Sequence, residues 1–162
     1  MTALTEGSKA PAFKGKDQNG SLHSLANYKG QKLIIYFYPR DNTATCTQQA
    51  CNLRDNFSLL KKNGFVVLGV SPDPIPKHKK FAETHQLPFA LLSDPDHQII
   101  DKYGVWGEKK LYGKKYMGLL RTSFIIDEKG LIQKIFLKPK SKIHATEILE
   151  AWALLKKKKY IF

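Results

Sequence analysis

The sequence predicts an α/β fold in which helices flank a central mixed β-sheet. Short apolar segments rich in β-formers alternate with helix-like segments between residues 33 and 103, which implies parallel strands joined by right-handed crossovers. Two strand-like segments then follow each other across a turn at residues 128–130, which adds an antiparallel hairpin. The 162 residues, 42% hydrophobic and 25% charged, fit one domain spanning residues 1–162.

The N-terminal part of the chain predicts a β-hairpin, then a buried strand, then a helix. Asn19-Gly20 lies between two short segments and is the strongest short hairpin signal. Residues 33–38 are an apolar run, as expected of a strand buried on both faces. The pattern from about residue 43 to 63 is helical and ends at Gly64. Its apolar positions recur at three- and four-residue spacing: Leu53, Phe57 and Leu60.

The rest of the chain continues the alternation of predicted strands and helices and ends with two strands and a helix. The predicted strands are residues 65–71, 89–94, 122–127 and 131–136, and the predicted helices are residues 76–85, 96–103 and 143–157. Segment 104–120 has four glycines and mixed polarity, and it is predicted to be a long ordered loop. With a cysteine at the first strand-to-helix junction, this order is typical of a thioredoxin-like fold with an N-terminal β-hairpin extension.

Charge and hydropathy bear on whether the protein binds nucleic acid or inserts into a membrane. Lys and Arg number 27 against 14 acidic residues, so the net charge of +13 makes nucleic acid a partner to consider. The lysines are scattered, and the basic tail at residues 156–162 predicts either favourable charge at a helix C-terminus or a solvated end. The apolar runs are far shorter than a bilayer span, and residues 1–7 lack the features of a signal peptide. We therefore expect a cytoplasmic protein.

Cys46 and Cys51 are the only two cysteines of the chain. On an intact α-helix their Cα atoms would stand about 8 to 9 Å apart. A disulfide needs about 4.4 to 6.8 Å between Cα atoms, so a bond between them requires the first turns of the helix to melt. In a reducing compartment such a pair is more often inert core thiols, metal ligands or catalytic groups than a structural bridge.

Thr43 is a candidate N-cap, which places Cys46 at the third helical position. The free N–H groups and positive dipole end of that turn stabilise a thiolate, so Cys46 is a candidate nucleophile. In the competing interpretation Cys46 is a small core residue. Cys51 is either a thiol that attacks an oxidised Cys46 or a buried helix residue. Arg121 precedes a strand, where its guanidinium either lies over the thiolate or is solvated.

A metal site is the weaker interpretation. The two cysteines lack the matching second pair of a zinc site, and the five histidines show no ligand spacing. The histidines are His23, His78, His85, His97 and His144.

Several motifs together resemble those of the peroxiredoxins, in the branch called bacterioferritin comigratory protein or peroxiredoxin Q. The core pattern is Pro39-x-x-x-Thr43-x-x-Cys46, completed by Cys51 and Arg121. The flanking segments 36–39, 46–55, 105–109, 112–114 and 121–127 extend the resemblance over nearly the whole chain. The chain departs from the family in one place, because Ala44-Thr45 stands where Pro-Gly is common.

The resemblance implies a thiol peroxidase with no metal, haem or flavin. It implies that Cys46 is the peroxidatic cysteine and Cys51 its resolving partner, that Thr43 and Arg121 complete the peroxide site, and that Pro39 shields it. It also implies recycling by thioredoxin or a similar dithiol protein, and the intramolecular pair removes the need for a dimer. Two other functions remain open on the residues alone: a general thiol-disulfide oxidoreductase, which lacks here its usual Cys-x-x-Cys spacing, and a basic nucleic-acid-binding protein.

Overall fold

The structure, a computed structural model, describes residues 1–159. Its strands are β1 (Lys14–Lys16), β2 (Leu22–Ser24), β3 (Lys32–Phe37), β4 (Phe65–Ser71), β5 (Ala90–Ser93), β6 (Trp106–Leu111), β7 (Lys114–Leu119), β8 (Thr122–Ile126) and β9 (Ile132–Phe136). Its helices are the 3-10 turn η1 (Leu25–Tyr28), then α1 (Ala44–Asp55), α2 (Phe57–Lys62), α3 (Ile75–His85), α4 (Gln98–Lys102) and α5 (His144–Lys159).

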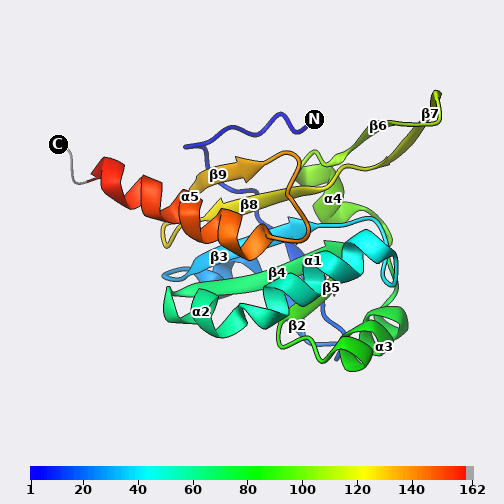
Figure 1. The fold of residues 1–162 in the computed structure, drawn as a ribbon, viewed down its shortest axis with the longest axis horizontal. Coiled ribbons are helices and arrows are strands. Elements are labelled where there is room, and N and C mark those ends of the chain that lie inside the picture. The colour runs from blue at the N-terminus through cyan, green and yellow to red at the C-terminus, as the bar shows by residue number, and fades with distance from the viewer. Residues whose placement is uncertain (160–162) are drawn as a thin grey trace.

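A seven-stranded mixed sheet forms the centre of the molecule, in the order β2-β1-β5-β4-β3-β8-β9 (Figure 1). β3, β4 and β5 run parallel, as their alternation with helices predicts. β8 pairs antiparallel with β3 and with β9, which is the C-terminal hairpin that the sequence predicts. β1 and β2 form the N-terminal hairpin and join the sheet through β5. The thioredoxin-like α/β fold is therefore confirmed.

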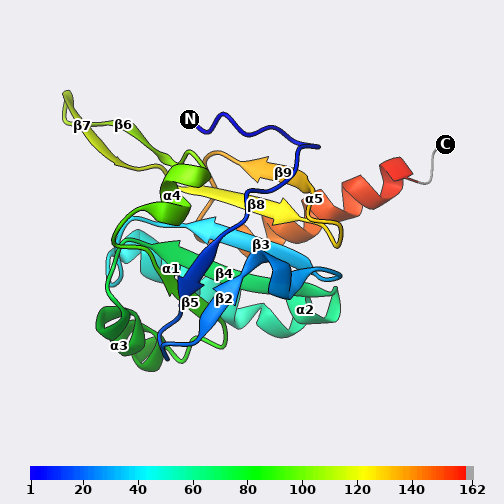
Figure 2. The same ribbon diagram turned by 180° about the vertical axis from the view of Figure 1, so that it is seen from behind.

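The sheet is covered on both faces because its central strands are apolar on both. Alternate residues of β3 point to opposite sides, so Ile34 and Tyr36 belong to one buried cluster and Leu33 and Ile35 to the other. The first cluster packs under α1, α2, α3 and α5. Of these helices, α1, α2 and α5 lie in front of the sheet in Figure 1. The second packs against α4 and the N-terminal segment, seen from behind in Figure 2.

The prediction of a long loop at residues 104–120 is wrong, because β6 and β7 form an antiparallel hairpin there. The hairpin projects from the body of the molecule (Figures 1 and 2). Tyr112 and Gly113 make its turn with φ of 51° and 78°, the left-handed pair that a tight hairpin turn requires. Tyrosine is unusual at such a position, and both faces of the strands carry polar residues, so neither a turn signal nor an apolar alternation marked the hairpin.

The predicted helix at 43–63 is divided into α1 and α2 at Asn56. The side-chain amide of Asn56 donates to the carbonyl of Asn52 at 2.9 Å, so it competes with the backbone for a helix acceptor. The basic tail from residue 156 lies at the end of α5 as far as Lys159, where positive charge is favourable, and residues 160–162 lie outside the described part of the chain. Across residues 1–159 we find no helix with the length and apolarity needed to cross a membrane.

Candidate active site

Cys46 lies where the sequence predicts it, at the third position of α1, directly beyond the end of β3. Its side chain is 1% exposed and belongs to the core cluster under α1. Thr43 occupies the N-cap position, but its hydroxyl donates to the carbonyl of Arg40 at 3.2 Å and makes no cap bond to the helix. The first turn of α1, which contains Cys46, therefore has N–H groups free of a helix partner and no side-chain cap.

Arg121 reaches the sulfur of Cys46 through the pairing of two strands. β8 runs antiparallel to β3, and Thr122 pairs with Phe37 at the end of β3, so Arg121 emerges beside α1. Its Nη2 donates to Cys46 Sγ at 3.0 Å. A guanidinium at this distance makes a charge-assisted hydrogen bond that stabilises a thiolate. Of the two interpretations of Arg121, the contact with the thiol is the one that the structure supports.

Gln49 completes this arrangement and was missed as a site residue. It follows Cys46 by three residues, so both side chains lie on one face of α1. Its Oε1 accepts from Nη1 of Arg121 at 3.3 Å, which fixes the second arm of the guanidinium. The Gln49 side chain is fully buried, and its Nε2 has no hydrogen-bond partner. The three-residue spacing was the one signal that could have found it.

The projecting hairpin also borders the site, through Lys109 of β6. The Lys109 ammonium donates to the carbonyl of Leu119 at 2.9 Å. Partial burial lowers the pKa of Lys109, the positive charge of Arg121 lowers it further, and Cys46 opposes the shift. The hairpin thus places a second cation near the thiol, which no local pattern of the sequence indicated.

Cys51 is a free, half-buried thiol five residues further along the same helix. Because α1 is intact from Ala44 to Asp55, the geometric argument for local unwinding applies directly. Pro39 is half-buried and lies between β3 and α1. Ala44 and Thr45, which replace the usual Pro-Gly, are exposed and keep Thr43 and Cys46 in register.

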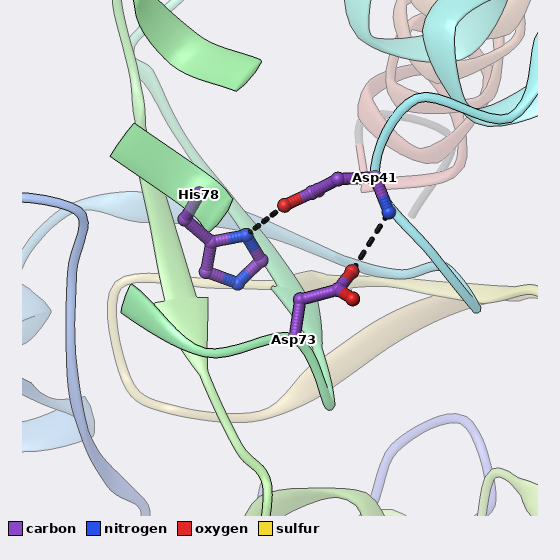
Figure 3. A group of neighbouring side chains, drawn as sticks. All are labelled: Asp41, Asp73 and His78. Atoms are coloured by element: carbon purple, nitrogen blue, oxygen red, sulfur yellow. Dashed lines mark hydrogen bonds and ion pairs between the residues drawn. The ribbon is translucent and has the colours of Figure 1, made fainter. Parts of the chain in front are cut away.

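A buried polar cluster anchors the loop between β3 and α1 (Figure 3). Asp41 accepts from the Tyr38 hydroxyl at 2.6 Å and faces His78 Nδ1 at 2.6 Å, while its backbone N–H donates to Asp73 at 2.7 Å. His78 Nε2 lies 3.1 Å from the carbonyl of Leu92, which only accepts. Nε2 is therefore the donor in the contact with Leu92, and Nδ1 shares a hydrogen bond with the Asp41 carboxyl group, so the buried ring is held from both sides.

Asp73 connects the same cluster to the partly exposed Lys77, with which it forms an ion pair at 3.0 Å. Burial raises the pKa of Asp73, but the Asp41 N–H, Lys77 and Ser71 together outweigh it and leave this pKa below its usual value. Asp41, Asp73 and His78 are also the one group in residues 1–159 whose ligand atoms could reach a common metal ion. Their carboxylate oxygens and ring nitrogens are engaged in hydrogen bonds and an ion pair with Lys77, which is the pattern of a structural network.

A cysteine sulfur at a helix N-terminus, hydrogen-bonded by an arginine and set on a thioredoxin-like fold, defines the class of thiol-dependent peroxidases. Comparison with known proteins agrees. The AhpC/TSA family model matches residues 7–135. The chain belongs to this family, and its relatives place it in the Bcp/peroxiredoxin Q branch.

Three proteins illustrate the similarity. Peroxiredoxin Bcp of Escherichia coli strain K12 is 48% identical over 136 residues, covering 84% of this chain and 87% of the relative. The structure of Xanthomonas campestris peroxiredoxin Q superposes with a TM-score of 0.81 at 31% identity, covering 86% of this chain and 88% of the other. The bacterioferritin comigratory protein of the same organism gives a TM-score of 0.83 at 28% identity, covering 93% and 96%.

Proposed function

We propose that Cys46 is the peroxidatic cysteine of this peroxidase, that Cys51 resolves its oxidised form, and that the substrates are hydrogen peroxide and organic hydroperoxides. The observation that carries the proposal is the 3.0 Å hydrogen bond from Arg121 Nη2 to Cys46 Sγ, because it sets a fixed cation on a buried thiol. The family assignment favours peroxide reduction over general disulfide exchange and over nucleic-acid binding. The work on the Xanthomonas campestris protein concerns its alkyl peroxide reduction, which supports the wider substrate class.

The first step is a displacement at oxygen. The Cys46 thiolate attacks the terminal oxygen of the peroxide, the O–O bond breaks, and the leaving alkoxide or hydroxide takes a proton to depart as alcohol or water. Arg121, the helix N–H groups and the Thr43 hydroxyl hold the two oxygens in line and stabilise the charge that develops on the leaving one. Pro39 shields the site. Cys46 is left as a sulfenic acid.

The second step joins the two sulfurs. The exposed first turn of α1 unwinds, and Cys51 attacks the sulfenic sulfur so that an S–S bond forms and water leaves. An external dithiol such as thioredoxin then reduces the disulfide by exchange. Cys51 lines a surface hollow with Gln48, Asn52, Asp55 and Lys142, so its sulfur is accessible to such a partner. The chain acts as a one-domain cytoplasmic monomer without a bound cofactor.

Mass spectrometry after one equivalent of hydrogen peroxide tests the assignment. We expect the wild-type chain to lose two hydrogens from the peptide that carries both cysteines. Cys46→Ser should abolish peroxide consumption with a dithiol reductant, whereas Cys51→Ser should complete one turnover and leave a sulfenic acid open to overoxidation. Full turnover by Cys46→Ser would refute the proposal.

A further inference from the structure

The resolving thiol lies next to a histidine that the mechanism above does not use. Cys51 Sγ is 3.9 Å from Nδ1 of His85, the last residue of α3. This is within the range of a weak hydrogen bond to sulfur, and in the tautomer that carries its proton on Nε2 the ring accepts from the thiol at Nδ1. Both side chains are half-buried, so the pair is neither sealed in the core nor fully solvated.

The position of His85 is fixed from two sides. Its ring stands edge-on to Phe81 one turn earlier on α3, with the ring centroids 5.1 Å apart. Its backbone carbonyl accepts from Nη1 of Arg54 at 2.8 Å, and Arg54 follows Cys51 by three residues on α1. The end of α3 is therefore hydrogen-bonded to the second half of α1 next to Cys51.

The second half of α1 is anchored to α5 as well. The Asn52 side chain donates to the carbonyl of Lys142 at 2.9 Å and accepts from the N–H of Ala145 at 2.8 Å. The first turn has no side-chain cap. When α1 unwinds for disulfide formation, we therefore expect the uncapped segment that carries Cys46 to leave its contact with Arg121 and move, while Cys51 stays beside His85.

From this arrangement we infer that His85 is the general base that activates Cys51 in the resolution step. This inference rests on the proposed function of the two cysteines. His85 Nδ1 takes the Cys51 proton, the thiolate attacks the sulfenic sulfur of Cys46, the S–O bond breaks as the S–S bond forms, and His85 returns the proton to the departing hydroxide as water. A thiol in water is only roughly a few per cent ionised at pH 7. A neighbouring base therefore raises the rate at which Cys51 attacks the sulfenic sulfur of Cys46.

The charged groups around the pair are compatible with this role. Arg54 lies on the same side of α1 and is paired with Asp55, whose carboxylate is 2.9 Å from Arg54 Nη2. Lys142 lines the hollow on which Cys51 opens. Within residues 1–159, the His85 imidazole is the proton-transferring side chain found in hydrogen-bond contact with the Cys51 sulfur, and an imidazole nitrogen can both accept and return a proton.

Single-turnover kinetics of the full chain tests the inference. Peroxide is mixed with the reduced protein, and formation of the Cys46 sulfenic acid and of the disulfide are followed as separate phases between pH 6 and 8.5. In His85→Gln we expect an unchanged first phase and a second phase roughly 10- to 30-fold slower at pH 7. In this variant the rate of the second phase should rise by about tenfold for each pH unit above 7, because hydroxide then removes the thiol proton in place of His85. Thr84→Gln, at the exposed neighbouring position, is the matched control.

A second variant separates proton transfer from structure. In His85→Ala, added imidazole should restore the second phase in proportion to its concentration. A disulfide that forms at the wild-type rate in His85→Gln, or a slow phase in His85→Ala that imidazole does not accelerate, overturns the role of His85. If the wild-type chain makes no disulfide between Cys46 and Cys51, the proposed function itself fails, which is a distinct result.

Discussion

The hydrogen bond between Arg121 and Cys46 allows a quantitative prediction for Arg121→Gln. The guanidinium makes two contacts, to Cys46 Sγ at 3.0 Å and to Gln49 Oε1 at 3.3 Å, and the first is charge-assisted. A hydrogen bond to a charged group is worth about 1.5–3 kcal/mol, which corresponds to about a 10- to 150-fold loss in the second-order rate of reaction with peroxide. Arg121→Lys keeps the charge but has no fork to span both partners, so we expect an intermediate rate.

The assay is rapid mixing of reduced protein with excess hydrogen peroxide at several concentrations, with the loss of free Cys46 thiol as the signal. Lys80→Gln removes one positive charge from the exposed face of α3 and should leave the rate unchanged. Thermal unfolding of each variant checks that the fold is retained. A rate for Arg121→Gln within twofold of the wild-type value would show that the contact contributes nothing to catalysis.

Two further predictions concern the buried polar groups. Asp41→Asn removes the carboxylate that faces the buried His78 ring at 2.6 Å and accepts from Tyr38, so urea unfolding at pH 7 should show a loss of about 1–3 kcal/mol, and a loss below about 0.5 kcal/mol would contradict the role of this contact. Burial lowers the pKa of His144 despite the opposing carboxylate of Glu147, so the folded state holds it neutral and the unfolded chain binds its proton first. Stability is then fully present above about pH 6.5 and falls below it by up to about 1.4 kcal/mol per pH unit, and unfolding curves of His144→Gln should lose this part of the slope. An identical slope in the variant would exclude His144 as its source.

The local features of the site could be read from the sequence because they depend on neighbouring residues. A strand-like run followed by the N-cap candidate Thr43 predicted where α1 begins and so placed Cys46 at its third position, although the Thr43 hydroxyl makes no cap bond in the structure. The helical spacing of Cys46 and Cys51 likewise fixes their separation without any tertiary information. The sequence did not predict the break between α1 and α2 at Asn56, because it depends on a hydrogen bond from the Asn56 side chain to the backbone carbonyl of Asn52.

The partners of the thiol could not be read in the same way. Arg121 is 75 residues from Cys46 along the chain, and only the pairing of β8 with β3 brings the two together. The Asp41–His78 pair similarly joins a loop to α3 across the ends of two parallel strands. The β6–β7 hairpin buries only Gly118 and Leu119 where it joins the body of the molecule, so its sequence carries no apolar alternation that predicts a strand.

The sequence by itself determined the order of elements, the helix position of Cys46 and the need for α1 to unwind before the two sulfurs can meet. These follow from side-chain periodicity and helix geometry, which are local. The tertiary structure decided which groups face the sulfurs: the Arg121 guanidinium, with Lys109 nearby, at Cys46, and the His85 imidazole at Cys51. Such contacts depend on strand register and helix packing, which arise only when distant parts of the chain are brought together.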